Sequence, residues 1–527
     1  MISRFRLLFD TVRHLKLVQI YYQVFYRLKK RRNLNYYNSS SKGDSYFNRL
    51  SFSLKNSPGG FASDDRAFNF LNLSQDFHDK IDWNYQGYGK LWNYNLQYFN
   101  YLNHDDLSVE SKNDWLLNIT DWLNDGRLKL EPYPVSLRIM NMIHYCSFEN
   151  RQDSIIVDSI YRQTKYLSRH LEYHLLGNHL LENGFALIMS GYAFDEKDWK
   201  VKAESILFKE LEEQILDDGG HFELSPMYHQ IILFRVLELC DWYTKVEGQN
   251  PVFLAFVQQK AIKMLNWLKN MTFLNGDIPH FNDSATGIAL SSNILFDYGN
   301  RLGFSQALIQ DLSESGYRKF SSNTYECVVD VAPIGPSYQP GHSHADALSF
   351  VLYGNKKPFI VDTGTSTYQI GNIRSWERST EAHNTVVIDA TNQSEVWGGF
   401  RVGKRAKVKI IAEDHKQLIA EHDGYRHNFK TLHKRSFAFA GNKIEILDEI
   451  GSCSGILAFH FHPYCIVQLL NEKSIKIEGI GEITLENAES LSLIQYEYAN
   501  GYNNYLKASK LIVNFKNNVK TTIHFNY

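Results

Sequence analysis

Hydrophobic residues recur with a helical period from about residue 46 to about residue 320. The apolar positions between Ile156 and Leu175 share one helical face, and residues 252–268 repeat the pattern with Trp267 near their end. Helical segments joined by polar loops, without recurring strand signals, predict a large helical domain. No fixed-length repeat is visible, so the pattern does not favour a solenoid.

The period of the hydrophobic pattern changes from about 3.6 to about 2 near residue 325. Leu348, Phe350 and Leu352 alternate along one predicted strand, Gly354-Asn355 forms a turn, and residues 359–361 form the return strand. Further strands are expected over residues 384–389, 404–411, 443–447, 456–461, 474–478 and 521–525. The sequence therefore predicts an α+β multidomain chain in which a helical domain precedes an antiparallel β domain.

These patterns divide the chain into three regions. We expect an N-terminal arm and linker over residues 1–45, the helical domain over 46–322 and the antiparallel β domain over 323–527. The linker itself is assigned to residues 33–45, because Asn, Ser and Gly cluster there. Both domains are long enough to bury a core of their own.

The N-terminal arm is strongly basic. Residues 1–33 contain nine Lys and Arg and one Asp, a charge of 9 − 1 = +8, whereas the whole chain carries 56 − 58 = −2. One helical face collects the apolar residues Phe5, Leu8, Phe9, Val12 and Leu15. A basic amphipathic helix ending in Lys29-Lys30-Arg31-Arg32 would make peripheral contact with an anionic membrane. The alternative is a helix that packs on the body of the protein and leaves its basic end in solvent.

The overall composition is that of a folded chain, with 43% hydrophobic and 22% charged residues. A net charge of −2 argues against a nucleic-acid partner. Aromatic residues make up 14% of the chain, and surplus Tyr and Trp suit a cleft that stacks on sugar rings. Packing in a large enzyme would account for them equally well.

The cysteines and the N-terminus bear on the cellular compartment. Five scattered cysteines without a CxxC spacing exclude a disulfide scaffold and a cysteine metal site. No stretch is long and apolar enough for a membrane-spanning helix, and Arg13 and Lys16 interrupt what would be the apolar part of a signal peptide. We expect the cytoplasm or the cytoplasmic membrane face, with the periplasm as the alternative.

The segment Gly341-His342-Ser343-His344-Ala345-Asp346 is the most informative for chemistry. Residues two apart in an extended chain point to the same side, so both histidines can face one cleft. Asp362 follows 18 residues after His344, and His383 lies 21 residues further on. His344, Asp362 and His383 form a reasonable zinc set, with water in the fourth position. A second His-x-His, at His460 and His462, has no carboxylate at such an offset and is expected to be structural.

Two helical segments place polar groups where helices seldom carry them. Asn178 and Glu182 share one face at i and i+4, with His179 beside them. The glycines and proline of residues 219–229 bend into a helix that begins near Met227. Tyr228 then lies in its first turn, where the helix dipole favours the phenolate. Both segments have an equally good structural interpretation, as satisfied core groups and as a capping loop.

From about Trp92 to about Gly424 the chain resembles the heparinase II/III-like polysaccharide lyases. The resemblance rests on motifs in the same order through both domains. They are Arg138 and Asn141, Gly177-Asn178-His179, Glu223-Leu224-Ser225-Pro226 with Tyr228, Asp277 and Asp283, residues 341–346, Asp362-Thr363-Gly364, Arg378-Ser379-Thr380 and Ala382-His383-Asn384-Thr385. The resemblance implies an N-terminal incomplete (α/α) toroid followed by a C-terminal antiparallel β-sandwich domain, with the substrate cleft between them.

The resemblance also implies β-elimination of a uronic-acid polysaccharide, and it assigns roles to residues. Asn178, with His179, would neutralise the uronate carboxylate, and Tyr228 and His342 would be the acid and base. His344, Asp362 and His383 would bind a structural divalent metal, Zn²⁺ first, at the cleft edge. The substrate-binding set is Arg138, Glu182, Glu223, Arg374 and Arg378, although each arginine has a structural ion pair as its alternative.

Other functions are also open at this point. A glycan-binding or polysaccharide-assembly protein would keep the fold without turnover, and the basic arm resembles heparinase-like proteins of surface-polysaccharide assembly. A glycoside hydrolase would need paired carboxylates, for which Asp277, Asp283 and Glu223 are available. The partners expected are an acidic polysaccharide substrate, the membrane surface and a second copy of the chain in a homodimer.

Overall fold

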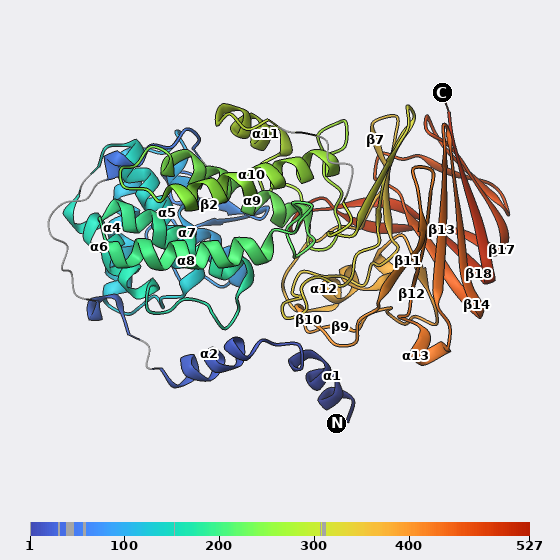
Figure 1. The fold of residues 1–527 in the computed structure, drawn as a ribbon, viewed down its shortest axis with the longest axis horizontal. Coiled ribbons are helices and arrows are strands. Elements are labelled where there is room, and N and C mark those ends of the chain that lie inside the picture. The colour runs from blue at the N-terminus through green and yellow to red at the C-terminus, as the bar shows by residue number, and fades with distance from the viewer. Residues whose placement is uncertain are drawn as a thin grey trace.

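The chain folds into a helical lobe and a sheet lobe that lie side by side, with the N-terminal arm along one edge (Figure 1). The computed structural model describes residues 2–29, 32–37, 47–55, 60–151, 153–305, 307 and 312–526. We call helices α3 to α11 the helical lobe and strands β4 to β18 the sheet lobe. The change from helices to strands falls between Arg301 and Tyr317, so the predicted fold class is confirmed.

The helical lobe consists of antiparallel neighbours with buried apolar faces. Its helices are α3 (Lys90–Tyr98), α4 (Val109–Asn124), α5 (Pro132–Phe148), α6 (Ser154–Leu167), α7 (Gly177–Ala193), α8 (Lys197–Gln214), α9 (Pro226–Tyr243), α10 (Pro251–Met271) and α11 (Ser292–Arg301). Local signals set several starts: proline occupies the first turn of α5, α9 and α10, and Ser225 and Asn250 cap α9 and α10. Helix α6 ends at Leu167, so the predicted face up to Leu175 continues beyond the helix.

The helical lobe also contains a small sheet that the sequence pattern did not predict. Strands β1 (Phe61–Ala62), β2 (Ala67–Phe70) and β3 (Leu73–Asp76) pair in that order, antiparallel throughout. Strand β2 buries Phe68 and Phe70, whose rings contact Trp115 and Trp92. Strands of two to four residues are too short to show a period of two, which is why the prediction of an all-helical segment was wrong here.

The sheet lobe packs two antiparallel sheets against each other. A four-stranded sheet runs β4-β5-β6-β7, and a nine-stranded sheet runs β11-β12-β13-β14-β18-β17-β16-β15 with β8 paired to β14. Phe350 of β6 meets Phe437 and Phe459 of the larger sheet, so the core lies between the two layers. The strands are β4 (Tyr317–Ser321), β5 (Tyr325–Asp330), β6 (Phe350–Gly354), β7 (Lys357–Ile360), β8 (Val386–Val387), β11 (Val408–Glu413), β12 (Gln417–His422), β13 (His433–Ala440), β14 (Lys443–His460), β15 (Val467–Asn471), β16 (Ser474–Ile477), β17 (Gly481–Ala499) and β18 (Tyr505–Phe525).

Two of the strands expected from the sequence form a single strand in the structure. Residues 443–447 and 456–460 belong to β14, which has 18 residues and changes register between Glu449 and Ser454, and residue 461 lies just beyond its end. The irregularity interrupts the alternation without ending the strand, so the sequence shows two short runs. The lobe is completed by β9 (Val396–Trp397) paired with β10 (Arg401–Val402), and by the short helices α12 (Asn372–Glu377) and α13 (Arg426–Phe429).

The N-terminal arm forms two helices instead of the single helix predicted. Helix α1 (Ile2–Val12) lies on the β9–β10 hairpin, where Arg6 pairs with Glu395 at 2.5 Å and Trp397 Nε1 donates to Thr11 Oγ1 at 3.3 Å. Helix α2 (Leu17–Leu28) lies on the helical lobe, and Lys16 pairs there with Glu213. The arm therefore contacts both lobes.

Parts of the predicted arm and linker lie outside the described residues. These are residues 1, 30–31 and 38–46, which include Lys30, Arg31 and most of the expected linker. The described part of that linker begins with a short 3-10 helix, Leu34–Tyr36.

Among the described residues, no helix combines the length and hydrophobicity needed to span a bilayer.

We predict that the free energy of unfolding falls on acidification partly through His229. This residue of α9 is fully buried, and burial lowers its pKa to about 3, from 6.5 in an exposed histidine. Between these values only the unfolded chain takes up the proton, so stability is lost as the pH falls through 6.5 and the loss ends near pH 3. One such group contributes a slope of about 1.4 kcal/mol per pH unit.

Urea unfolding at a series of pH values measures this effect. His229→Gln keeps an amide that can donate to the Met264 carbonyl, which His229 Nε2 contacts at 3.0 Å, and it should flatten the slope below pH 6.5. His78→Gln is the matched control, because 81% of the His78 side chain is exposed. Equal slopes for the wild type and His229→Gln would contradict the assignment.

Candidate functional site

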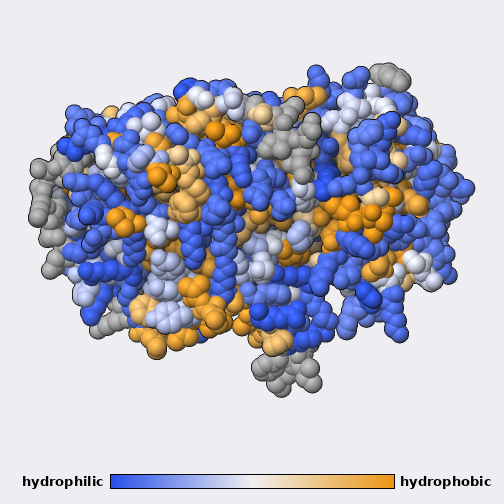
Figure 2. All heavy atoms as spheres, in the orientation of Figure 1, coloured by the Kyte–Doolittle hydropathy of each residue, from blue (hydrophilic) through white to orange (hydrophobic). Residues whose placement is uncertain are grey.

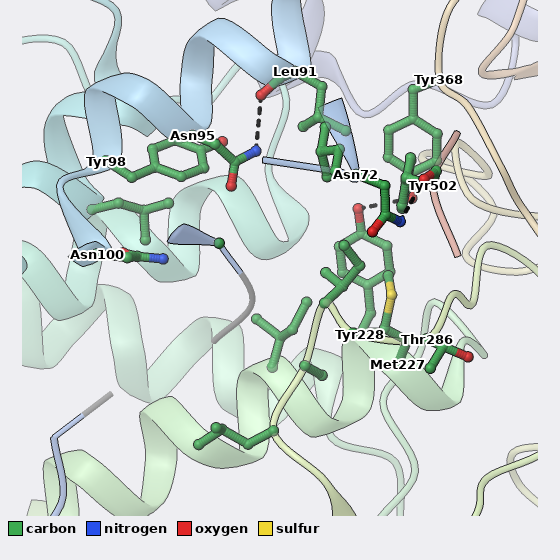
Figure 3. A pocket seen from close by; sticks show the side chains of 18 of the residues that line it. Asn72, Leu91, Asn95, Tyr98, Asn100, Met227, Tyr228, Thr286, Tyr368 and Tyr502 are labelled. Atoms are coloured by element: carbon green, nitrogen blue, oxygen red, sulfur yellow. Dashed lines mark hydrogen bonds between the residues drawn. The ribbon is translucent and has the colours of Figure 1, made fainter. Parts of the chain in front are cut away.

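A cavity of about 360 Å³ opens between the two lobes. Helices of the helical lobe contribute Tyr98, Tyr133 and Tyr228 to its walls, and the sheet lobe contributes Tyr368 and Tyr502 (Figure 3). Tyrosine offers an apolar ring with a polar edge, which suits the alternating apolar and hydroxylated surfaces of a sugar. The cavity therefore has the chemistry of a carbohydrate site.

Tyr228, which lines this cavity, contacts His342 although 114 positions separate the two residues in the sequence. Their ring centroids lie 4.0 Å apart at an interplanar angle of 32°. Tyr228 stands in the first turn of α9, where Ser225 caps the helix by accepting from the Tyr228 amide at 3.2 Å. The Tyr228 hydroxyl shares a hydrogen bond with the Tyr368 hydroxyl at 3.1 Å (Figure 3).

The expectation that the helix dipole favours the phenolate of Tyr228 is wrong. Burial raises the pKa of Tyr228 well above its usual value, and the neighbouring Tyr502 and Tyr133 add to the rise. Desolvation disfavours the charged form more than the dipole of one helix end supports it. Tyr228 is thus a neutral phenol at neutral pH, able to donate a proton.

Asp283 is the residue that holds His342 in place. Its carboxylate is fully buried and accepts from His342 Nδ1 at 2.8 Å and from His344 Nε2 at 2.9 Å. Both terminal nitrogens of Arg374 donate to the same carboxylate, one of them at 2.6 Å. Burial alone would raise the pKa of Asp283, but Arg374 and the two histidines hold it well below the usual range.

This arrangement fixes the protonation pattern of the His342 ring. An ionised carboxylate only accepts hydrogen bonds, so Nδ1 must carry the hydrogen that faces Asp283. In the neutral ring Nε2 then keeps its lone pair and can accept a proton. His342 and Tyr228 therefore present a proton acceptor and a proton donor side by side.

Backbone hydrogen bonds join the chain segments that carry these side chains. The Asp283 amide donates to the His342 carbonyl at 3.0 Å, and the His344 amide donates to Asn282 Oδ1 at 2.9 Å. Ser225 Oγ donates to the Asp283 carbonyl at 2.7 Å. The start of α9 and the segments around residues 283 and 343 consequently form one connected unit.

Four non-glycine residues with left-handed backbone flank the site residues. They are Leu176 (φ 62°), Leu224 (φ 57°), Asn282 (φ 55°) and Leu348 (φ 63°). Leucine rarely adopts this conformation, which costs of order 1 kcal/mol and persists only where the surroundings impose it. The chain bends sharply at these positions, next to Gly177, Glu223, Asp283 and the segment after His344.

Asn178 and His179 lie in the first turn of α7. The Asn178 side chain is buried and its Oδ1 has no hydrogen-bond partner. His179 stacks on Tyr133 with ring centroids 4.4 Å apart, and its Nδ1 lies 3.2 Å from Glu172. Burial lowers the pKa of His179, but the Glu172 carboxylate outweighs this effect and the pKa is raised.

The two predicted substrate-binding glutamates differ in their surroundings. Glu182 lines the cavity and pairs with Arg235, whose Nε lies 3.2 Å from Oε2. Glu223 is buried, and burial raises the pKa of its carboxyl against the lowering effect of His342 and His179. Glu223 therefore interacts electrostatically with both His179 and His342.

The three predicted substrate-binding arginines are buried and bonded to protein acceptors. Arg138 donates to Gln163 Oε1 at 2.7 Å, and burial lowers its pKa to about 9. Arg374 is committed to Asp283, and Arg378 donates from Nε and a terminal nitrogen to the Ser343 carbonyl at 3.1 and 2.8 Å. Of the three, Arg374 forms the structural ion pair that the sequence left as the alternative, whereas Arg138 and Arg378 donate to uncharged oxygens. Arg374 and Arg378 position the His342–His344 segment.

The predicted zinc set is brought together in the sheet lobe. His383 Nδ1 lies 2.6 Å from Asp362 Oδ2, and the rings of His344 and His383 are 5.3 Å apart. His344 Nδ1 and His383 Nε2 are buried without partners, so each ring has a nitrogen free to bind a cation. No three His, Cys, Asp or Glu side chains within the described ranges already converge at metal-binding geometry. The zinc site stays a prediction.

The carboxylates available for hydrolysis are not paired. Asp283 is held by Arg374 and two histidines, and Asp277 is exposed and accepts from Tyr353 at 3.2 Å. Asp277 lines a second pocket of about 530 Å³, and Tyr228 is not among the residues of its wall. A general acid and a base of the kind that a glycoside hydrolase uses are therefore not placed across one cavity by these residues.

Sequence reasoning missed the roles of Asp283, Tyr133, Tyr368 and Tyr502. Asp283 was noted only as a motif position and as a hydrolytic candidate. The tyrosines gave no signal beyond the high aromatic content, because they come from separate segments and no spacing links them. Only the fold shows that they surround one cavity.

Two family models match the chain, one in each lobe. The heparinase II/III N-terminus matches residues 138–298, and the heparinase II/III-like C-terminal domain matches residues 306–526.

Among curated proteins, heparin-sulfate lyase from Bacteroides stercoris is 26% identical over 323 residues, which are 55% of this chain and 46% of the relative. Heparin-sulfate lyase from Pedobacter heparinus is 25% identical over 397 residues, 66% of this chain and 58% of the relative. The chain thus aligns with about half the length of these relatives.

The fold is also similar to solved structures. Heparinase III superposes with a TM-score of 0.65 at 17% identity, covering 85% of this chain and 79% of the other. A heparan sulfate lyase from Pedobacter heparinus gives 0.57 at 18% identity, covering 86% and 79%. The helical lobe is accordingly an (α/α) toroid and the sheet lobe a β-sandwich.

We predict that Asp283→Asn lowers the free energy of unfolding by about 3 kcal/mol or more, because it leaves the buried Arg374 charge unpaired. Chemical denaturation measures the loss. Asp277→Asn, which neutralises an exposed carboxylate in the neighbouring segment, should change stability by no more than about 0.5 kcal/mol. If both variants unfold alike, the Asp283 cluster does not carry the stability assigned to it.

Proposed function

The chain belongs to the heparinase II/III-like family, and from that premise we propose that it is a polysaccharide lyase acting on an acidic, uronic-acid-containing glycan by β-elimination. The contact between Tyr228 and His342 at a tyrosine-lined cavity carries the proposal. The names of the heparin-sulfate lyases support a glycosaminoglycan-like substrate. The unpaired carboxylates argue against the hydrolase alternative.

β-Elimination requires a base for the C5 proton of the uronate and an acid for the glycosidic oxygen. His342 is the proposed base, since Asp283 holds hydrogen on Nδ1 and leaves Nε2 as acceptor. Tyr228 is the proposed acid, since its raised pKa keeps the phenol protonated. As Nε2 takes the C5 proton, the C4–O bond breaks, a C4–C5 double bond forms, and the phenol proton goes to the leaving oxygen.

The developing negative charge on the uronate carboxylate needs a hydrogen-bond donor. Asn178 and His179 are proposed for this task. The raised pKa of His179 favours its cationic form, which donates from both ring nitrogens, and Asn178 beside it carries an amide NH2 group that can donate. Glu182, through its pair with Arg235, would orient the sugar from the cavity wall.

We also propose that His344, Asp362 and His383 hold a divalent cation, Zn²⁺ first, in a structural role. Two free, buried ring nitrogens and a carboxylate are the donor types that zinc selects. A bound cation would fix the segments after His342 and before β8. The proton transfers belong to Tyr228 and His342 and need no step on the cation.

We predict that replacing either member of the pair abolishes product. The assay follows the ultraviolet absorbance of the unsaturated uronate across a panel of uronate polymers. Tyr228→Phe and His342→Gln should each lower the rate by about 10²-fold to 10⁴-fold, the usual contribution of an acid or base. Tyr368→Phe, which removes only the hydroxyl that contacts Tyr228, should retain most of the activity.

Three outcomes of this assay discriminate between the candidate functions. Full activity of both variants would refute the assigned roles. Tight glycan binding without cleavage, even by the wild type, would favour the glycan-binding alternative. Reducing ends without the absorbing double bond would indicate hydrolysis.

We predict that the purified protein contains about one divalent cation per chain and that removing it lowers the melting temperature by about 5 °C. Elemental analysis and thermal unfolding with and without a chelator measure both quantities. His383→Gln should lose the cation, whereas His422→Gln should keep it, because His422 is an equally buried histidine bonded to His433 at 3.2 Å. The proposed cation site would be refuted if the purified wild type contained no metal and the chelator did not change its melting temperature.

A further inference from the structure

The outer face of the N-terminal arm is apolar. On α2, Leu17 and Leu28 are 83% and 82% exposed, and Val24 between them is 54% exposed. The other exposed apolar side chains of the arm are Leu8, Phe9, Val12, Ile20, Tyr21 and Phe25. Figure 2 shows hydrophobic residues gathered along the lower edge of the molecule, where Figure 1 places α2. Such a patch marks an interaction surface rather than ordinary surface composition.

The inner face of α2 combines polar contacts with the packing of half-buried Val18 against the core of the helical lobe. Gln19 is the buried residue, and its side chain donates to the Leu175 carbonyl at 3.2 Å. Tyr26 donates to the Leu171 carbonyl at 2.6 Å, and Tyr22 stacks on Tyr173. A helix evolved only to pack on the body would not leave Leu17, Val24 and Leu28 in solvent. The contacts of α2 agree with the alternative of a helix packed on the body, but that alternative does not explain its exposed apolar face.

The charge of the arm indicates the chemistry of the missing partner. Residues 1–33 carry +8, so the remaining residues carry −2 − 8 = −10. Arg13, Arg27 and Arg32 are exposed, with Arg13 3.5 Å from Asp10, while Arg6 and Lys16 pair with the body. Apolar residues bordered by cations match an anionic lipid surface, which offers hydrocarbon and negative charge together.

The length of the helices determines the mode of contact. Helix α2 has 12 residues and so measures about 18 Å, against about 30 Å for the hydrocarbon core of a bilayer. It can lie in the plane of the interface but cannot cross it. Its neighbour α1, with 11 residues, has the same limit and exposes Phe9 and Val12.

We propose that the N-terminal arm, helices α1 and α2, docks the protein on the surface of an anionic lipid bilayer. The outer residues Leu17, Val24 and Leu28 enter the headgroup boundary, and Arg13 and Arg27 contact lipid phosphates. A second copy of the chain would instead bring two arms of charge +8 together, which like-charge repulsion disfavours. The proposal is independent of the lyase activity.

Vesicle sedimentation with the full chain tests the proposal. The probes are vesicles of phosphatidylcholine alone and vesicles with a third of phosphatidylglycerol. The wild type should bind the anionic vesicles and lose them at high salt. The triple variant Leu17→Ser, Val24→Ser, Leu28→Ser should bind at least ~10-fold less.

The matched control is the triple variant Val201→Ser, Val252→Ser, Leu274→Ser, whose sites are 60%, 71% and 70% exposed on the helical lobe. It should bind vesicles like the wild type. Equal loss in both variants, or no binding of anionic vesicles by the wild type, overturns the proposal. Sedimentation velocity over a concentration series covers the homodimer: a dimer that the arm variant dissociates, without vesicle binding, would also overturn it.

Discussion

A single buried carboxylate organises the site between the two lobes. Asp283 reaches His342, His344 and Arg374 at once, and these side chains come from two segments of the sheet lobe, the His342–His344 segment and α12. Its own segment is bonded to Ser225 at the start of α9, so the cluster also connects the helical lobe. In a low-dielectric interior such a network is stable only when every member is present, because one unpaired charge costs several kcal/mol.

The same dry environment separates the protonation states of the two facing rings. The Tyr228 hydroxyl is buried and bonded to the Tyr368 hydroxyl, so burial dominates and the phenol keeps its proton. His342 has an ionised carboxylate behind it, which fixes the hydrogen on Nδ1. The rings of Tyr228 and His342, whose centroids lie 4.0 Å apart, thus differ in role because Tyr228 bonds to Tyr368 and His342 bonds to the Asp283 carboxylate.

The sequence predicted the order of the lobes and both members of the Tyr228–His342 pair. The change of hydrophobic period near residue 325 was enough to predict a helical lobe followed by a sheet lobe. The motifs around His342, Asn178 and Tyr228 were visible as local patterns. The domain boundaries at residues 45 and 322 stay predictions. The left-handed turns at Leu176 and Leu224 were invisible, because leucine carries no signal for them and tertiary contacts impose them. The buried state of Arg374 was equally hidden, since its partner lies 91 positions away.

The two anchor points of the arm have a mechanical consequence for the cleft. Helix α1 is fastened to the β9–β10 hairpin by Arg6 and Thr11, and α2 is fastened to the helical lobe by Lys16, Gln19 and Tyr26. Residues 13–16 are too few to absorb a large displacement between these points. A change in the angle between the lobes would therefore have to break the contacts of α1 or those of α2. The arm thus links the two walls of the cleft by a second, non-covalent connection besides the chain that joins the lobes.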